Sequence, residues 1–546
     1  MIFRKNEPEW LAEAIIYQIY PQSFQDSNGD GIGDLQGIIN RLDYLKSLGV
    51  NTLWLNPCFD SPFGDAGYDI RDFYKIAPRY GTEADMINLF EQAHASGLRV
   101  VLDLVAGHTS MDHHWFEWEA KNPKHPQANR YIWKNRDFDK EEGPTRDDFV
   151  SNFFWHQPAL NFGWETVEEP WQDSVDAPGP RKNREELRKI LAYWFDLGCD
   201  GFRVDMAASL VKQNPDFSGK PTGNIALWQE IRAWMDEKYP DRILAAEWSE
   251  PSRALKAGFH LDFMIHFNAV GYPSLFFNGT GTLPYRDGPC YFDDPGNGCY
   301  VSFRDSYADQ LKKTAGKGYI SLPTACHDFQ RLRCGSRGWA GLWPAWVFLM
   351  TQAGVPTIYY GDEIGMRFVE GTAPKEGSTL TGVIAPNAGA PDGERAGTRT
   401  PMQWNQTKND GFSTASPKFL YLPLDDDPKR PTVAQQETHS NSLLNFVKEL
   451  LHLRKTHPAL GADASFEILN PDGVIYPLLY QRRAKSETCL IVINPTASAQ
   501  SIRVKSSDVE LKQLIGNAVE AVPREDGLSF QTSPFGFAIF SVQEAD

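Results

Sequence analysis

Three acidic residues in this sequence stand at the ends of apolar segments, where they could act together as catalysts. Asp205 ends the segment GFRVD, Glu247 ends ILAAE, and Asp328 stands in CHDFQR. In a strand, residues two positions apart point to the same face, so Arg203 and Asp205 are expected to project together. An arginine beside a carboxylate holds it ionised and oriented, which suits a nucleophile. The alternative for this pair is a buried structural ion pair.

The other two carboxylates would complete the chemistry of glycosidic bond cleavage. Trp248 and the apolar residues before Glu247 would desolvate that carboxyl group and raise its pKa, as a general acid requires. Its alternatives are a helix N-cap or a surface carboxylate. Glycoside hydrolysis needs a proton donor and a nucleophile or base on either side of the anomeric carbon. A third carboxylate, Asp328, can hold ring hydroxyls while the sugar distorts.

A loop rich in oxygen donors is the candidate metal site. The segment DSNGDGIGD (26–34) matches the first nine positions of an EF-hand loop, although Gly37 stands where the bidentate Glu of position twelve belongs. We expect a structural Ca²⁺ there, or Mg²⁺, remote from the chemistry, and no organic cofactor. The alternative is an acid-rich turn that caps the helix from Leu35. The expected ligands are Asp26, Asn28, Asp30, Ile32 and Asp34.

The elements that must position these residues alternate between apolar strands and amphipathic helices. Each expected strand is continuously apolar, as in a parallel sheet that is buried on both faces. Eight such βα units predict the α/β class and a closed (β/α)8 TIM barrel, which builds its active site at the carboxyl ends of its strands. The expected strands are 14–20, 51–57, 99–105, 201–205, 243–247, 262–267, 319–327 and 356–361.

The pattern also predicts a domain organisation. Helices are expected over 35–49, 82–96, 183–197 and 224–238, and a long insertion interrupts the barrel after its third strand, as a lid would. Short alternating strands after about 462 indicate a small antiparallel domain. The predicted domains are the first part of the barrel (1–105), an inserted lid subdomain B (106–182), the second part of the barrel (183–461) and a β-sandwich-like C-terminal domain (462–546).

Composition excludes some partners but names no function. The 546 residues carry 54 Lys and Arg against 71 Asp and Glu, a net charge of -17, which disfavours nucleic acid and anionic lipid as partners. No stretch is apolar enough to span a membrane, and the N-terminus lacks the apolar core of a signal peptide. The seven cysteines include no CxxC pair, which indicates reduced thiols in a cytoplasmic protein. Cys290 and Cys299 could pair if the protein were exported.

The order of these motifs resembles the α-amylase superfamily of retaining glycosidases and transglycosidases over nearly the whole chain. The strand 3 motif of that family appears as DLVAGH (103–108), its strand 4 motif as GFRVD, and its strand 7 motif as His327-Asp328. By this resemblance Asp205 is the nucleophile, Glu247 the acid/base and Asp328 the transition-state stabiliser. The residues that would contact the sugar at subsite −1 are His108, Arg203 and His327.

Within that superfamily the sequence is most similar to the oligo-1,6-glucosidase, α-glucosidase and trehalose synthase group. This similarity rests on residues 14–38, GYDIRDFYKI (67–76) and RTPMQW (399–404). The resemblance implies a substrate contact by Tyr68 and a pocket that Asp69 and Arg399 close around the non-reducing glucose. That implies an exo-acting enzyme. The alternative for Asp69 and Arg399 is a salt bridge that anchors a loop.

Three departures from the family pattern bear on the substrate. Gly107 replaces the strand 3 Asn, so no calcium is expected between barrel and lid. Cys326 replaces the usual Asn before His327-Asp328, and Ala159 replaces the Asp of the lid signature QPDLN. Cys326 would either change the polarity near subsite +1 or affect only packing.

The leading hypothesis is a retaining exo-acting α-glucosidase that acts on small oligosaccharides. The alternative is a trehalose synthase-like or sucrose-active glucosyl transferase or isomerase with the same three carboxylates, because residues 396–424 resemble both groups. A third hypothesis, a non-catalytic relative such as a transporter subunit, predicts a membrane segment and the loss of a catalytic carboxylate. The sequence shows neither.

Overall fold

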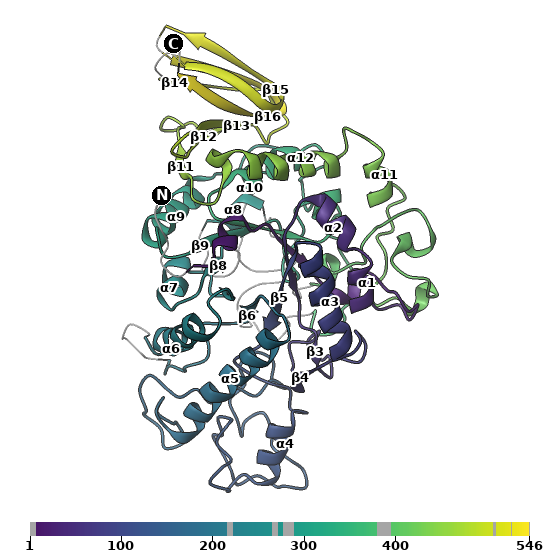
Figure 1. The fold of residues 1–546 in the computed structure, drawn as a ribbon, viewed down its shortest axis with the longest axis vertical. Coiled ribbons are helices and arrows are strands. Elements are labelled where there is room, and N and C mark those ends of the chain that lie inside the picture. Colours follow the sequence, from purple (N-terminus) through teal and green to yellow (C-terminus); the bar gives the residue numbers. More distant parts are fainter. Residues whose placement is uncertain are drawn as a thin grey trace.

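The computed structural model describes residues 7–215, 222–264, 271–276, 289–378, 395–505, 509–525 and 527–544. Its centre is a closed barrel of eight parallel strands in the order β1-β10-β9-β8-β7-β6-β5-β2 (Figure 1). The predicted (β/α)8 barrel is therefore confirmed. The barrel strands are β1 (Ile16–Ile19), β2 (Thr52–Leu55), β5 (Arg99–Leu104), β6 (Gly201–Val204), β7 (Ile243–Ala246), β8 (Leu261–Phe263), β9 (Tyr319–Pro323) and β10 (Val355–Tyr359).

Every expected strand segment overlaps one barrel strand, but the strands are shorter than the apolar segments, and β8 and β10 each begin one residue before the expected start. The barrel strands are almost entirely buried, because helices cover the outside and side chains fill the inside. β9 ends at Pro323, which leaves 324–327 to turn at the barrel mouth. The register of β5 and β6 sets Asp103 opposite Arg203. Residues 265–267 of the sixth expected segment lie outside the described residues.

The single helix expected over 35–49 is wrong, because two helices take its place. α1 (Leu35–Ile39) and α2 (Leu42–Leu48) are separated at Arg41, whose φ of -113° and ψ of 7° are not helical. Arg41 Nε donates to Gln25 Oε1 at 2.7 Å, and its guanidinium lies 4.0 Å from the ring centre of Trp404. These tertiary contacts outweigh the helical periodicity.

The other expected helices are present with small shifts. α3 (Glu83–Ala95) begins with a capping box between Thr82 and Asp85. α5 (Pro178–Asp196) begins five residues before its expected start, since Pro178 suits the first turn of a helix. The remaining helices of eight residues or more are α4 (His114–Lys121), α6 (Gly223–Lys238), α9 (Val301–Thr314), α10 (Leu342–Thr351) and α12 (Leu443–Thr456).

Residues 105–177 form a long excursion between β5 and α5, and α4 lies within it at the bottom of Figure 1. The excursion folds back onto the barrel mouth. His108 and Ala159 form an antiparallel bridge, and Leu160 N donates to Gly107 O at 3.0 Å. A two-stranded sheet of β3 (Phe59–Asp60) and β4 (Asp72–Ile76) lies between β2 and α3 in the sequence. The excursion is therefore attached beside the strand ends that carry the acidic residues.

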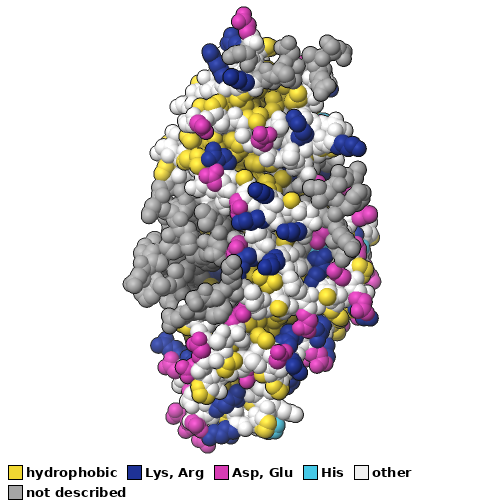
Figure 2. Space-filling view, turned by 90° about the vertical axis from the view of Figure 1, so that its left-hand side faces the viewer, with side chains coloured by type: hydrophobic (Ala, Val, Ile, Leu, Met, Phe, Trp, Pro, Cys, Tyr) yellow, Lys and Arg dark blue, Asp and Glu magenta, His cyan; other side chains and the backbone are white. Residues whose placement is uncertain are grey.

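The C-terminal antiparallel sheet is confirmed and lies above the barrel in Figure 1. One of its faces contacts α10, and the other holds a small core that includes Leu490, Ile502 and Phe530. Figure 2 shows apolar side chains gathered over this upper part. No helix in the described chain is long and apolar enough to cross a membrane. The strands are β11 (Ser465–Ile468), β12 (Leu478–Arg483), β13 (Thr488–Ile493), β14 (Gln500–Lys505), β15 (Val509–Arg524) and β16 (Gly527–Glu544).

Candidate active site

A buried arginine joins three carboxylates from three neighbouring strands at the barrel mouth. Arg203 Nη1 lies 2.8 Å from Asp103 Oδ1 and 3.0 Å from Asp205 Oδ1. Arg203 Nη2 lies 2.8 Å from Glu247 Oε2. Asp205 directly follows β6 and Glu247 directly follows β7, so the parallel register brings these two to one level. Asp103 lies within β5 opposite Arg203, two residues before that level. The structure therefore brings Arg203, Asp205 and Glu247 together as the sequence predicts.

The Asp205 and Glu247 carboxyl groups are held by the same guanidinium and affect each other's charge. Burial raises the pKa of Asp205 well above its ordinary value, the Glu247 carboxylate raises it further, and Arg203 opposes both effects. Burial also raises the pKa of Asp103 to about 6, although Arg203 lowers it. One guanidinium thus contacts three carboxyl groups. Because one positive charge cannot balance three negative charges, the site without a bound sugar keeps a proton at a pH where isolated carboxyl groups would lose theirs.

Strained backbone follows each of the two carboxyl residues. Met206, directly after Asp205, has a φ of 42°, and Ser249, two residues after Glu247, has a φ of 60°. Met206 N donates to Glu247 Oε2 at 2.8 Å, so the turn after β6 orients the side chain from β7. Non-glycine residues in this region cost of the order of 1–3 kcal/mol each and persist where the surroundings enforce them.

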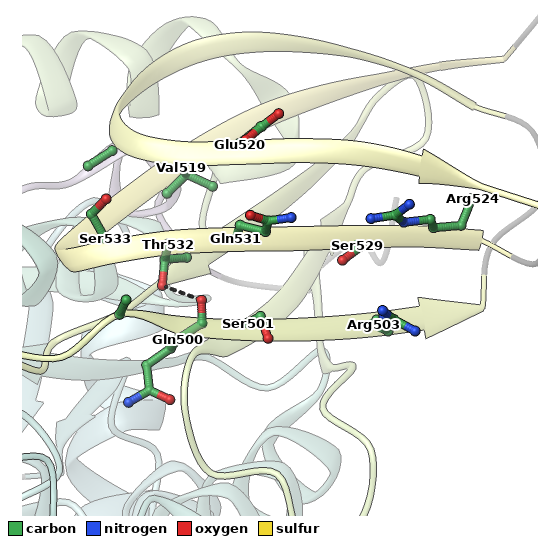
Figure 3. Close-up of a pocket in the computed structure, with 12 residues that line it drawn as sticks. Gln500, Ser501, Arg503, Val519, Glu520, Arg524, Ser529, Gln531, Thr532 and Ser533 are labelled. Atoms are coloured by element: carbon green, nitrogen blue, oxygen red, sulfur yellow. Dashed lines mark hydrogen bonds between the residues drawn. The ribbon is translucent and has the colours of Figure 1, made fainter.

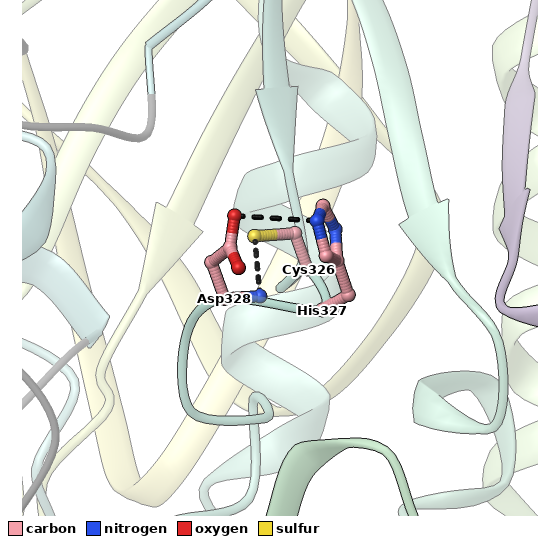
Figure 4. A group of neighbouring side chains, drawn as sticks. All are labelled: Cys326, His327 and Asp328. Atoms are coloured by element: carbon pink, nitrogen blue, oxygen red, sulfur yellow. Dashed lines mark hydrogen bonds and ion pairs between the residues drawn. The ribbon is translucent and has the colours of Figure 1, made fainter. Parts of the chain in front are cut away.

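Cys326, His327 and Asp328 follow β9 and form a compact group (Figure 4). His327 Nε2 lies 3.3 Å from Asp328 Oδ2, and Asp328 N donates to Cys326 Sγ at 3.3 Å. The guanidiniums of Arg395 and Arg399 both donate to Asp328 Oδ1. Asp328 thus already binds two cations through Oδ1, and burial raises the pKa of the Cys326 thiol, which disfavours the thiolate that a metal would need. The group therefore suits a fixed carboxylate rather than a metal ion.

The two candidate histidines are buried and neutral. Burial lowers the pKa of His108 to about 3, and that of His327 also lies well below its ordinary value. His108 Nε2 donates to Tyr68 O at 3.1 Å, and its Nδ1 accepts from Asn152 Nδ2 at 3.1 Å. His327 Nδ1 accepts from Gln18 Nε2 at 3.0 Å. Each ring is thus held in one tautomer by its neighbours.

The ring of Tyr68 stacks on that of His327, with ring centres 5.3 Å apart and an angle of 7° between the planes. The Tyr68 hydroxyl donates to Asp103 Oδ2 at 2.9 Å and accepts from Asn56 Nδ2 at 2.9 Å. Tyr68 contacts both the Arg203 network and the His327-Asp328 turn. Tyr68 therefore links the two halves of the candidate site.

Asp69 is fully buried and bound to its own loop. Its carboxylate accepts from Ser61 Oγ at 3.0 Å, from Gly64 N at 2.7 Å and from Asp65 N at 3.0 Å. Arg399 instead contacts Asp328 and His327 O. No ion pair joins Asp69 to Arg399 within the described residues, so the two do not form the loop-anchoring salt bridge considered above.

Several residues of the site were not singled out from the sequence. Asp103 carried the same signal as Asp205, a carboxylate at a strand end, and Arg395 lies four positions before Arg399. Asp65 contacts Arg395 at 3.3 Å and accepts from Gln157 Nε2 at 2.8 Å, which ties the excursion to the site. Asp65, Gln157 and Arg395 are far apart in the sequence and come together only in the folded chain.

A half-buried lysine and the asparagine that it holds explain the departure at Gly107. Lys212 Nζ donates to Ser209 O at 2.6 Å and to Asn152 Oδ1 at 2.5 Å, and Asn152 also holds His108. A Cβ atom at Gly107 would lie 2.8 Å from Asn152 Nδ2, which is too close. Burial lowers the pKa of Lys212 to about 8, so the ammonium form prevails at neutral pH. This cation joins the excursion to the turn after β6.

Lys212→Met is expected to lower the melting temperature by about 2–5 °C, because it removes two part-buried hydrogen bonds from a charged donor, each worth about 1.5–3 kcal/mol at most. The measurement is thermal unfolding followed by circular dichroism. Lys189→Met is the control, since Lys189 is exposed and pairs only with Glu185 and Glu186. An unchanged melting temperature for Lys212→Met would show that the bridge has no stabilising role.

The loop of the candidate metal site is folded by its own hydrogen bonds. Asp26 Oδ2 accepts from Gly31 N at 2.8 Å, and Asp34 Oδ2 accepts from Ser27 N at 2.9 Å. Asp34 Oδ1 accepts from Gly37 N, so the helix cap that was the alternative to the metal site is present. Within the described chain, Cys326, His327 and Asp328 are the group of His, Cys, Asp or Glu side chains whose ligand atoms lie within 4.8 Å of one another. The three aspartates of the loop over residues 26–34 are spread more widely than that. The donors are all hard oxygens, which fits Ca²⁺.

Comparison with known proteins gives the family. The profile described as "Alpha amylase, catalytic domain" matches residues 18–463. The chain is 30% identical to trehalose synthase/amylase TreS of Mycobacterium tuberculosis (strain CDC 1551 / Oshkosh) over 515 residues, which cover 86% of this chain and 79% of that protein. It is 30% identical to oligo-1,6-glucosidase of Parageobacillus thermoglucosidasius over 584 residues, 98% of this chain and 100% of the relative. Trehalulose synthase MutB of Pseudomonas mesoacidophila MX-45 has the same fold, with a TM-score of 0.78, 24% identity and coverage of 98% of this chain and 100% of that one. The profile spans most of the chain on its own, and we conclude that this protein belongs to the alpha-amylase family of glycoside hydrolases and glycosyl-transferring enzymes.

Proposed function

We propose that the protein is a retaining exo-acting α-glucosidase for small oligosaccharides. The observation that carries this proposal is the group in which one guanidinium, that of Arg203, contacts Asp205 at 3.0 Å and Glu247 at 2.8 Å. Retaining glycosidases hold their two carboxyl groups about 5–5.5 Å apart, and inverting enzymes hold them about 6.5–9.5 Å apart to admit a water. Contact of both carboxyl groups with a single guanidinium supports the shorter separation.

In the proposed first step, an Asp205 oxygen attacks the anomeric carbon as the bond to the leaving oxygen breaks. Glu247 gives its proton to that oxygen, and the product is a β-glucosyl ester of Asp205. In the second step Glu247, now a carboxylate, takes a proton from water, whose oxygen displaces Asp205 and restores the α configuration. Asp328, held by two arginines and His327, would bind ring hydroxyls as the sugar distorts.

The proposed glucose pocket is lined by the residues around this group. Tyr68, His108 and His327 would contact the sugar, and Asp69 and Arg399 would bind its non-reducing end, which supports exo action. Substrate would have to compete for the hydrogen bonds that Asp69 makes within its loop. The seven free thiols support the expected cytoplasmic location.

The second candidate function is a trehalose synthase-like or sucrose-active transfer of glucose to another sugar. The 30% identity to trehalose synthase/amylase TreS favours it. The chemistry would be the same, but a sugar hydroxyl would replace water, so the choice depends on how well residues 106–182 act as a lid and exclude water.

Product analysis distinguishes these candidates. The enzyme is incubated separately with maltose, isomaltose, trehalose and sucrose, and the products are separated by anion-exchange chromatography. Glucose as the main product supports the glucosidase, and disaccharides isomeric with the substrate support the transferase. No reaction with any α-glucoside, including p-nitrophenyl α-glucoside, would contradict both.

We also propose a structural Ca²⁺ in the loop over residues 26–34, for which Mg²⁺ could substitute. Its ligands would be Asp26, Asn28, Asp30, Ile32 and Asp34. Saturating Ca²⁺ is expected to raise the melting temperature by about 5 °C over the protein in EDTA, because the ion binds only the folded loop. Asp30→Ala is expected to abolish this difference. An equal melting temperature of the wild type in Ca²⁺, Mg²⁺ and EDTA would contradict the proposal.

A further inference from the structure

Apart from the barrel mouth, the structure has a cavity of about 650 Å³ on the surface between three stretches of chain: 333–339 after β9, 406–410, and 427–436. That volume is typical of pockets that bind small molecules. None of its lining residues belongs to the carboxylate network of the proposed active site.

An exposed indole forms one wall of this cavity. The side chain of Trp339 is 38% exposed, which is unusual among the large apolar residues of the described chain. The ring is nevertheless fixed, since Trp343 packs edge-on against it at 5.8 Å and the Arg333 guanidinium lies 5.2 Å from its centre. A Cβ atom at Gly365 would lie 2.6 Å from the indole, so glycine there lets the ring pack closely. Trp339 is therefore a rigid apolar platform at the surface.

Other lining residues offer polar side-chain groups that the protein does not use. The side chain of Gln406 is exposed and makes no hydrogen bond within the described chain, and the side chain of Gln435 uses only its Oε1, which accepts from Thr432 Oγ1 at 3.0 Å. The turn that carries Gln406 is held firmly by Asp410, whose carboxylate accepts from Arg430 Nη2 at 2.8 Å. Two exposed side-chain amides thus line the same pocket as a rigid ring.

The charges of the pocket cancel to a large extent. Arg430 is neutralised by Asp410, which leaves Arg333 and Lys429 against Asp427. A polyanion would meet a carboxylate here, and a cation would meet the arginine and lysine. A flat ring beside amide, guanidinium and carboxylate groups instead matches a neutral, polyhydroxylated ligand, whose apolar face stacks on the ring while its hydroxyls form hydrogen bonds.

Another groove on the surface lacks this combination. It lies over β14, β15 and β16 of the C-terminal sheet, with Arg503, Arg524 and Glu520 among its lining side chains (Figure 3). Its lining contains no aromatic ring. The pocket beside Trp339 is therefore the better candidate for a sugar.

We propose that the Trp339 pocket is a second, non-catalytic binding site for neutral oligosaccharides. Trp339 provides the stacking surface, and Arg333, Gln406, Gln435 and Asp427 provide hydrogen bonds to the hydroxyls. Such a site would hold a longer chain on the enzyme while the barrel mouth acts on its end.

The test is native electrophoresis through gels that contain soluble starch, with all variants built on Glu247→Gln to prevent turnover. Trp339→Ala is expected to weaken retardation by starch about 10-fold or more, as the loss of a central aromatic anchor does. Trp339→Phe is expected to keep most of it, and Trp118→Ala, which removes an indole that is 42% exposed elsewhere, to keep all of it. In the otherwise wild-type enzyme, Trp339→Ala is expected to leave kcat/KM for p-nitrophenyl α-glucoside within about twofold.

Equal retardation of Trp339→Ala and its parent, or an equal loss in Trp118→Ala, would overturn the proposal. So would retardation by dextran sulfate but not by starch. A melting temperature of Trp339→Ala close to that of its parent shows that the variant is folded. Failure of the enzyme to hydrolyse the aryl glucoside would contradict the proposed glucosidase and leave the starch result intact, so the two proposals fail separately.

Discussion

Asp205→Asn is expected to lower kcat/KM for p-nitrophenyl α-glucoside by about 10⁴-fold or more, because an amide cannot form the glucosyl ester. The side chain is nearly isosteric, and its amide oxygen can still accept from Arg203. The loss is therefore expected in kcat, without a comparable loss of folding. Initial rates and thermal unfolding of the same preparations measure both.

Asp176→Asn is the matched control, since Asp176 is exposed and makes only a surface ion pair with Arg181 at 3.5 Å. Its activity is expected to equal that of the wild type. If Asp205→Asn kept more than about 1% of the activity in preparations free of wild-type enzyme, another residue would have to be the nucleophile.

Glu247→Gln is expected to lower kcat/KM for maltose by about 10²–10⁴-fold, as the loss of a general acid does. The loss is expected to be much smaller for p-nitrophenyl α-glucoside, whose leaving group needs no proton. Azide is expected to restore turnover of the aryl glucoside and to give α-glucosyl azide, because it displaces Asp205 from the β-glucosyl ester with inversion and needs no general base. Equal rates for the wild type and Glu247→Gln on both substrates would favour a non-catalytic relative.

The pH profile gives a second test of the same variant. Burial and the Glu247 carboxylate raise the pKa of Asp205, so the pair keeps its proton above the ordinary carboxyl range. Wild-type kcat/KM is expected to rise as pH rises through the raised pKa of Asp205, because the nucleophile must be ionised, and to fall at higher pH, where Glu247 loses the proton of the general acid. In Glu247→Gln this alkaline limb is expected to disappear. An unchanged alkaline limb would assign it to a different group.

The barrel could be predicted because its signal is local and repeats. Each strand is a short apolar segment followed by a polar residue, and eight of them are separated mostly by helical patterns. The helix over 35–49 could not be predicted correctly, since its break at Arg41 depends on Gln25 and Trp404. The long pair β15 and β16 was missed in part because β15 alternates weakly and is stabilised along its whole length by β16.

The residues of the site could be predicted where a strand end marks them, as for Asp205, Glu247 and Asp328. Their partners could not. Arg395 contacts Asp328 and Asp65 from a loop whose pattern contains no strand or helix, and Asp69 is bound by its own loop instead of facing Arg399. The role of Gly107 becomes clear only when Asn152 and Lys212 are seen beside it. Contacts between loops depend on how the closed barrel places the loops relative to one another. The sequence predicts the barrel but not those positions.

The central claim is that Asp205 carries the glucosyl group during the reaction, and a trapped intermediate tests it most directly. The wild-type enzyme is treated with a 5-fluoro glucosyl fluoride, digested with pepsin, and mapped by tandem mass spectrometry. The account predicts one adduct per chain, on Asp205 in the segment GFRVD. An adduct on any other residue, or turnover of the reagent with inversion and no adduct, would contradict it.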